Sequence, residues 1–125
     1  MHRMMSRADI FLSTSDYNEG WGVVINESMR QGCAVVASSA MGAVPFMIKD
    51  GINGFACRWN DFDKFYDCVK RLINDRQLYT QISYNAMKTI EDEYSPDVAA
   101  DRFCRYCAGE RFREGICSPA KIRKK

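Results

Sequence analysis

The sequence predicts an α/β fold with three layers, in which a short parallel sheet of about three strands lies between helices. Three short apolar runs, at residues 8–13, 34–37 and 55–57, are separated by a helical segment and by a loop. Strands that alternate with crossover segments are typical of a parallel sheet. Beyond residue 60 the apolar residues recur with the 3.6-residue period of helices, so helices are expected to follow the sheet.

Each strand is predicted from a brief run of apolar residues. The run at 8–13 ends in small and polar residues, where a strand gives way to a loop. The run at 34–37 is uniformly apolar, as parallel strands covered on both faces are. The third run follows a turn at 50–54, in which Asn53 and Gly54 form a common turn pair that tolerates positive φ.

Two helical segments are predicted between these strands. Residues 22–31 are expected to form a helix that ends at Gly32, because glycine suits the left-handed conformation just past a helix end. One further helical turn is expected at residues 46–49, after a loop of small residues.

Three helices are predicted after the sheet. The first is capped by Asn60 or Asp61, the second covers about 77–91, and the third begins at Ser95 with Pro96 in its first turn. Their apolar residues recur at helical spacing and are expected to pack in the core. These residues are Phe62, Phe65, Tyr66, Val69, Leu72, Ile73, Leu78, Ile82, Ala86, Ile90, Val98, Ala99, Phe103 and Tyr106.

The composition predicts one folded protein. Of its 125 residues 46% are hydrophobic and 27% are charged, which excludes a disordered chain. The net charge of +2 is too small to indicate nucleic acid or an acidic partner. Residues 121–125 carry most of the excess positive charge. This tail is expected to be solvated, and the alternative is a weak attraction to an anionic membrane surface.

The chain shows no pattern of a membrane span or an export signal. No apolar run reaches the ~18 residues that a bilayer requires, and residues 1–7 are charged without an apolar core after them. We therefore expect a cytoplasmic protein, with peripheral association at the inner membrane surface as the alternative. In that reducing compartment the six cysteines are expected to be thiols.

The segment at 19–27, EGWGVVINE, combines two carboxylates with two glycines that flank Trp21. Glycine lets a ligand approach the backbone, and the first turn of a helix attracts anions, phosphate above all. Glu19 lies in the predicted loop and Glu27 within the predicted helix, and their carboxylates suit sugar hydroxyl groups. The alternative is that Glu19 is a solvated loop residue and Glu27 is a helix surface residue, because two glutamates at this spacing also occur by chance.

Four linked segments resemble one known family. They are ADIFLSTS at 8–15, EGWGVVINESMRQGCAVVAS at 19–38, GAVP at 42–45 and DGING at 50–54. The order and the approximate spacing are similar to those of retaining glycosyltransferases of family 4, the group 1 glycosyl transferases. The resemblance covers residues 8 to about 107, and four linked motifs are far more specific than one.

The resemblance implies the GT-B fold of two Rossmann-like domains, with a nucleotide-diphosphate sugar held mainly by the C-terminal one. Residues 1–94 would be the C-terminal half of that donor-binding domain, 95–110 a C-terminal helix and 111–125 a basic tail. The family transfers sugars to glycan, lipid or polysaccharide precursors and retains the anomeric configuration. It needs no bound metal or other cofactor.

By motif match, residues 19–27 would form the donor site. Glu19 would contact the donor sugar hydroxyls and is the catalytic candidate, whereas Glu27 would accept hydrogen bonds from the ribose hydroxyls. The amides around Trp21, Gly22, Val23 and Val24 would lie near the diphosphate or the sugar. The donor-binding candidates are therefore Glu19, Gly20, Trp21, Gly22, Val23, Val24 and Glu27.

The chain departs from the family pattern at three residues. Ala34 stands where the family usually has proline, and Ser28 stands where it usually has alanine. Both changes concern packing rather than the donor. Phe46 replaces the usual glutamate, and this change is expected to alter the wall of the pocket.

The chain also lacks much of what the family carries. Its strands match the fourth, fifth and sixth of the order 3-2-1-4-5-6. The first three strands, the arginine and lysine that neutralise the diphosphate, and the acceptor-binding domain are not in the sequence. We therefore expect a fragment that is inactive alone. The strand at 9–13 would have an open edge, which predicts a homodimer or a swapped arrangement.

Two other interpretations remain open. One is a non-catalytic module that binds a nucleotide or a partner glycosyltransferase chain. The other is a metal or redox protein built on Cys104, Cys107 and Cys117. Zinc prefers four ligands, and the one histidine is His2, at the other end of the chain. These thiols are therefore expected to be unpaired, whereas Cys33, Cys57 and Cys68 are expected to be small core residues.

Overall fold

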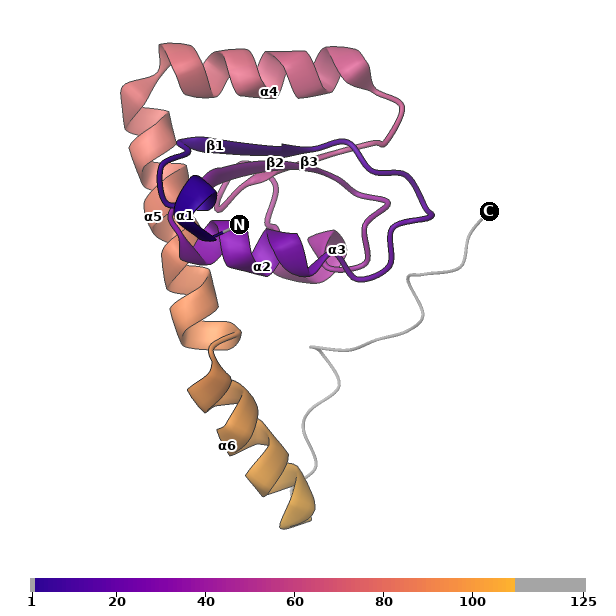
Figure 1. The fold of residues 1–125 in the computed structure, drawn as a ribbon, viewed down its shortest axis with the longest axis vertical. Helices are drawn as coiled ribbons and strands as arrows, with labels where there is room; N and C mark the ends of the chain where they lie inside the picture. The colour runs from indigo at the N-terminus through magenta and orange to yellow at the C-terminus, as the bar shows by residue number, and fades with distance from the viewer. Residues whose placement is uncertain (1, 110–125) are drawn as a thin grey trace. The chain divides into compact units, whose positions relative to one another are not determined.

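The computed structural model describes residues 2–109, and its chain divides into two compact units after Tyr94. The elements are shown in Figure 1. In chain order they are α1 His2–Met5, β1 Ile10–Ser13, α2 Val23–Arg30, β2 Ala34–Ser38, α3 Val44–Met47, β3 Phe55–Cys57, α4 Phe62–Asn74, α5 Arg76–Glu93 and α6 Pro96–Cys107.

The three strands form one parallel sheet in the order β1-β2-β3. Ile10 pairs with Ala34 and Leu12 with Val36, so alternate residues of the strands share a face. Helices cover both faces: α4 lies on one side of the sheet, and α2 and α3 lie on the other (Figure 1). The predicted three-layer α/β architecture with a short parallel sheet is confirmed.

The core consists of one apolar cluster on each face of the sheet. The first joins Val35 and Ala37 to α2 and α3, and its main members are Ile25, Met29, Met41, Val44, Met47, Ala86 and Ile90. The second joins Ala34 and Val36 to α4, and its other buried members are Phe55, Cys57, Phe65, Cys68, Leu72 and Ile82. Helix α5 contributes to both clusters, which ties the two layers together.

Side-chain caps explain where the later helices begin. Asp61 accepts a hydrogen bond from the Lys64 amide at 3.1 Å, and Asp75 accepts one from the Leu78 amide at 2.9 Å. In the second unit the Ser95 hydroxyl accepts one from the Val98 amide at 3.3 Å. Each cap satisfies an amide that has no partner within its helix. Asp61 is therefore the cap of α4, and the predicted start at Ser95 and Pro96 is confirmed.

Two predicted helix boundaries are wrong. Helix α3 covers Val44–Met47 rather than 46–49, because Pro45 is accepted in the first turn and Ile48 is already extended, with φ −101° and ψ 120°. Helix α5 runs from Arg76 to Glu93, longer than predicted at both ends. Only Asp75 separates it from α4, and that residue serves as its cap.

The prediction that all apolar helical residues pack in the core is also wrong. On α4 the buried residues are Phe65, Cys68 and Leu72. The other predicted core residues on this helix include Phe62, Tyr66 and Ile73, whose exposed fractions are 68%, 65% and 69%. Helix α6 has no buried residue within the described part of the chain; of its predicted core residues, Phe103 and Tyr106 are 68% and 69% exposed, Ala99 is exposed and Val98 is half-buried.

The cysteines divide into two groups. Cys33, Cys57 and Cys68 are buried thiols, as predicted. Cys104 and Cys107 are exposed thiols, and Cys117 lies outside the described residues. Residues 2–109 contain no group of three or more side chains that could hold a metal ion. They also contain no helix long and apolar enough to cross a membrane.

Candidate functional site

The candidate site begins in the loop that follows the carboxyl end of β1. The Asp16 carboxylate accepts hydrogen bonds from the Asn18 amide and side chain, both at 2.9 Å, and the Glu19 amide donates to the Asp16 carbonyl at 3.3 Å. This small turn presents Glu19 as an exposed residue directly before Gly20. The predicted placement of Glu19 in a loop is therefore confirmed.

Gly22 links this loop to α2 and has a left-handed conformation, with φ 81° and ψ 58°. A Cβ atom added there would lie 2.6 Å from Cε of Met41. The Met41 methyl is the end of a flexible side chain and can shift, so the left-handed backbone angle is the reason why this position favours glycine. No side chain caps this helix start within the described chain, so the first amides of α2, at Val23 and Val24, point toward the space before the helix.

The loop before α3 holds this backbone in place. The Gly42 amide donates to the Gly20 carbonyl at 3.0 Å, and the Ala43 amide donates to the Trp21 carbonyl at 2.8 Å. A Cβ on Gly42 would lie 2.9 Å from the Gly20 carbonyl oxygen and 3.3 Å from Cα of Trp21. Glycine at position 42 thus allows two segments about twenty residues apart in the sequence to touch through their backbones.

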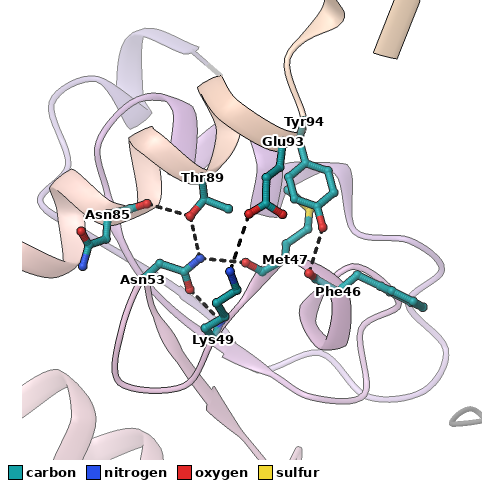
Figure 2. A network of polar contacts seen from close by, with 8 residues as sticks. All are labelled: Phe46, Met47, Lys49, Asn53, Asn85, Thr89, Glu93 and Tyr94. Atoms are coloured by element: carbon teal, nitrogen blue, oxygen red, sulfur yellow. Dashed lines mark hydrogen bonds and ion pairs between the residues drawn. The ribbon is translucent and has the colours of Figure 1, made fainter. Parts of the chain in front are cut away.

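An aromatic pair lies next to this backbone contact. The rings of Trp21 and Phe46 stack with their centroids 5.7 Å apart, and Trp21 remains 49% exposed. The backbone of Phe46 is also fixed, because its carbonyl accepts a hydrogen bond from the Tyr94 hydroxyl at 2.9 Å (Figure 2). Phe46 therefore supports the Trp21 ring, a partnership that the sequence did not predict.

Glu27 lies within α2 and is half-buried. Its neighbour Ser28 is fully buried, and the Ser28 hydroxyl donates to the Val24 carbonyl at 2.8 Å and contacts the Ile25 carbonyl at 3.0 Å. The hydroxyl group is thereby satisfied inside the helix, which explains how serine replaces a smaller residue beside the site.

The turn at 50–54 supports the site rather than forming part of its surface. Asn53 is 1% exposed; its amide group donates to the Met47 carbonyl and to the Thr89 hydroxyl, both at 2.9 Å, and its oxygen accepts from the Lys49 amide at 2.7 Å (Figure 2). The positive φ expected in this turn occurs at Gly51, with φ 76°, and not at Asn53. Asn53 is therefore required for its side chain.

The start of α2 is an open surface. Glu19 is exposed, Val23 is 60% exposed, and the half-buried Glu27 follows one turn later. Surface hollows lie along α4 and α5 instead; one of about 570 Å³ is lined by Asp67, Lys70, Arg71, Asn74, Asp75 and Leu78. The predicted site residues therefore lie together at the start of α2. They form one wall of the candidate site, beside the edge of the sheet.

This fold and the motif order identify the class of protein. Residues 1–89 match the family model described as glycosyl transferases group 1. The chain therefore belongs to the group 1 glycosyl transferase family. The architecture is that of part of a GT-B C-terminal domain.

Curated relatives are longer proteins of this kind. The chain is 27% identical over 106 residues to the lipopolysaccharide core biosynthesis glycosyltransferase LpsE of Rhizobium meliloti, covering 85% of this chain and 31% of the relative. It is 30% identical over 104 residues to the lipopolysaccharide 1,2-N-acetylglucosaminetransferase of Salmonella typhimurium, covering 82% and 27%. The chain thus spans about a third of the length of these relatives or less.

Solved structures show the same fold. The C-terminal domain of the glycosyl transferase group 1 family protein LpcC from Francisella tularensis is 32% identical with a TM-score of 0.65, and the match covers 70% of this chain and 44% of that domain. Anabaena HepE, solved in complex with UDP, is 24% identical with a TM-score of 0.75, and the match covers 86% and 29%.

Proposed function

We propose that this chain is part of a retaining glycosyltransferase of family 4 and carries one wall of its donor site. The enzyme would move a sugar from a nucleotide-diphosphate donor to a glycan, lipid or polysaccharide precursor. The observation that carries the proposal is the glycine-led start of α2, which places Glu19, Trp21 and Glu27 at the carboxyl end of a parallel sheet. Ligands bind at this end of open α/β sheets.

The backbone at the start of α2 suits the diphosphate of the donor. Free amides and the positive end of the helix dipole favour an anion at this point. Gly20 keeps the approach to these amides clear of side chains, and a Cβ there would meet no heavy atom within 4 Å. Trp21, Val23 and Val24 are assigned to donor binding through their amide groups.

The two glutamates suit the hydroxyl groups of the donor. Glu19 is assigned to the transferred sugar, and Glu27 to the ribose. In the reaction, the bond between the anomeric carbon and the phosphate oxygen breaks, a bond to the acceptor oxygen forms on the same face of the sugar, and the acceptor hydroxyl gives its proton to the departing phosphate oxygen. The leaving diphosphate gains negative charge, which the helix start stabilises. We assign no metal or other cofactor to this step.

Two solved structures of one neighbour support the choice of donor. Anabaena HepE was solved with UDP and also with UDP-glucose. Both of these matches lie below 25% identity and therefore support only the fold. The donor class is our proposal for this chain. We place the enzyme in the cytoplasm; the alternative is peripheral association at the inner membrane surface through the basic tail.

The experiment that tests the proposal measures binding of UDP and UDP-sugars to the 125-residue chain by isothermal titration calorimetry. We expect weak saturable binding, because one wall of the site is present. Glu27→Gln should weaken UDP binding about tenfold, in line with ~1.5 kcal/mol for a hydrogen bond to a charged group. Glu91→Gln, at an exposed position of α5, is the control and should leave binding unchanged.

Turnover separates this proposal from a binding module. The chain alone is expected to show no transfer from UDP-sugars, and measurable transfer would show that it is not a fragment of the active unit. A longer protein that supplies the rest of the donor domain and the acceptor domain should transfer sugar, and Glu19→Gln should remove most of that activity. Retained activity in Glu19→Gln, or UDP binding without turnover in the longer protein, would favour the non-catalytic module.

The open edge of the sheet also bears on assembly. Strand β1 pairs with β2 on one side and has no strand partner on the other among residues 2–109. An unpaired strand edge is a template for association. We therefore expect the isolated chain to form a homodimer through β1 at high concentration, and a monomeric mass under those conditions would contradict this.

A further inference from the structure

The side chain of Trp21 has no role in the proposed donor contacts, which use its amide. Hydrogen bonds from the amides of Gly42 and Ala43 fix the backbone of residues 20–21. One edge of the indole lies against the same loop, because a Cβ on Gly42 would be 3.4 Å from its Cε3 atom. The Phe46 ring stacks against the indole with centroids 5.7 Å apart, yet Trp21 remains 49% exposed. The indole therefore has a fixed place and an uncovered surface, in the loop between β1 and α2 where ligands of open α/β sheets bind.

Tyr94 fixes the second ring of this pair from the end of α5. Its hydroxyl donates to the Phe46 carbonyl at 2.9 Å (Figure 2). Its own amide donates to the Ile90 carbonyl at 3.1 Å, which keeps Tyr94 on the last turn of the helix. Phe46 and Tyr94 both pack against the core cluster that joins the sheet to α2 and α3. Phe46 is therefore held by its ring and by its backbone, and it can hold the indole in turn.

The chemistry around these rings combines carboxylates with aromatic surface. Glu19 is exposed two residues before Trp21, and Asp16 belongs to the same turn. A sugar ring suits both groups, because its hydroxyls donate to a carboxylate and its slightly positive C–H bonds meet the negative face of an aromatic ring. A sugar that carries its own carboxylate would be repelled by Glu19 and Asp16. The combination therefore favours an uncharged pyranose.

We propose that the exposed surface of the Trp21 indole binds the C–H face of the donor sugar and selects an uncharged pyranose. Phe46 supports the indole, and Tyr94 is the positioning residue that holds Phe46. We call the rings of Trp21 and Phe46 the aromatic platform. This inference rests on the proposed function and deepens it, because it names the class of sugar and gives the platform a part in specificity.

Titration of the 125-residue chain with UDP and UDP-sugars tests the aromatic platform. Calorimetry gives the affinities, and Trp21 emission is followed in a Trp59→Phe background with excitation selective for tryptophan. At least one of UDP-glucose, UDP-galactose and UDP-N-acetylglucosamine should bind about threefold tighter than UDP or better, the gain expected of one aromatic contact. The same sugar should shift the emission to shorter wavelength, which UDP should not do. UDP-glucuronate should bind no tighter than UDP, and Trp21→Leu should lower the affinity ratio of neutral UDP-sugar to UDP to about one.

Tyr94→Phe tests the positioning role. It keeps the ring in the core and removes the hydrogen bond to the Phe46 carbonyl, so the affinity ratio of neutral UDP-sugar to UDP should fall and Trp21 emission should shift to longer wavelength. Tyr79→Phe is the matched control, because it removes the hydrogen bond from the Tyr79 hydroxyl to Asp9, 3.0 Å long, at the amino end of β1. It should leave the ratio and the emission unchanged. A loss of stability alone would change the ratio in neither variant.

Several results would overturn the inference while UDP still binds. They are an equal affinity of UDP and of every neutral UDP-sugar, tighter binding of UDP-glucuronate than of the neutral sugars, and a full change of Trp21 emission with UDP alone, since the base would then occupy the indole. An equal fall of the affinity ratio in Tyr79→Phe would remove the positioning role of Tyr94. Failure of UDP and of all UDP-sugars to bind would instead contradict the proposed function, and the inference with it.

Discussion

The indole ring of Trp21 stacks on the ring of Phe46, with centroids 5.7 Å apart and an angle of 29° between the planes. Trp21 lies in the loop before α2 and Phe46 lies in the short helix α3, and backbone hydrogen bonds join residues 20–21 to residues 42–43. The Phe46 ring therefore offers apolar surface to the neighbouring indole, whereas a carboxylate at this position would offer negative charge to a ligand.

Restoring a glutamate at this position should release the indole. Phe46→Glu is expected to shift Trp21 fluorescence to longer wavelength and to lower the free energy of unfolding by about 1 kcal/mol, the value of an aromatic pair. The measurement is made in a Trp59→Phe background with excitation that is selective for tryptophan, so that Trp21 is the only tryptophan observed. Phe62→Glu, at a residue 68% exposed, should leave the spectrum unchanged. An unchanged spectrum in Phe46→Glu would mean that the stack does not persist in solution.

Gly22 and Gly20 should respond differently to alanine. Gly22→Ala forces a left-handed conformation on a residue with a Cβ and brings that atom within 2.6 Å of Met41. We expect a loss of about 1–3 kcal/mol in the free energy of unfolding. Gly20→Ala meets no heavy atom within 4 Å and should change stability by less than about 0.5 kcal/mol. Equal losses in urea unfolding would contradict the assignment of strain to Gly22.

Asn53 should be more important for stability than its place in a turn suggests. Asn53→Ala removes three hydrogen bonds from a residue that is 1% exposed, and an unsatisfied buried group costs about 1–3 kcal/mol. We therefore expect a loss of at least about 2 kcal/mol. Asn85→Ala, which removes one exposed side-chain bond to the Ile52 carbonyl, should cost under about 1 kcal/mol. Chemical unfolding of both variants provides the comparison.

The buried thiols should make the protein sensitive to alkaline pH. Burial, followed by the influence of Cys68, raises the pKa of Cys57 from 9.0 to about 12. The protonated thiol therefore stabilises the folded state fully below pH 9, and that contribution is lost as the pH rises toward 12. We expect the melting temperature to fall above pH 9, and less steeply in Cys57→Ala than in the parent chain.

The exposed Cys104 provides the control for this pH dependence. Cys104→Ala should leave the slope of melting temperature against pH unchanged, because this thiol is exposed and its removal takes nothing from the buried core. Iodoacetamide should also modify Cys104 and Cys107 well before Cys57. Rapid alkylation of Cys57 in the folded protein would show that it is not held as a buried thiol.

The sequence predicted the sheet well because the strands carry local signals. The strand at 34–37 is a uniformly apolar run, and it lies in the centre of the sheet with all five residues of β2 buried. Gly32 was predicted to follow a helix end, and its φ of 82° agrees. The loop and helix placements of Glu19 and Glu27 were predicted in the same way. Their roles toward a donor stay predictions.

Contacts between distant residues could not be predicted in this way. The apolar period of α4 identified a wide stripe but not which part of it the chain covers, so Phe62 and Ile73 were wrongly assigned to the core. Asn53 was recognised as a turn residue, whereas its partner Thr89 is 36 residues away. The support of Trp21 by Phe46 likewise depends on a loop and on helix α3, which meet only in the folded chain.

Helix α5 bears on how this chain unfolds. Ile82 packs in the cluster beneath α4, whereas Ala86 and Ile90, one and two turns later, pack in the cluster with α2. Its middle is also tied to the end of α2 by the Ser83 hydroxyl, which donates to the Gly32 carbonyl. Neither helical layer can separate from the sheet without exposing apolar surface of α5 to water. Amide protons on opposite faces of the sheet should therefore exchange with the same opening free energy, as one cooperative foldon.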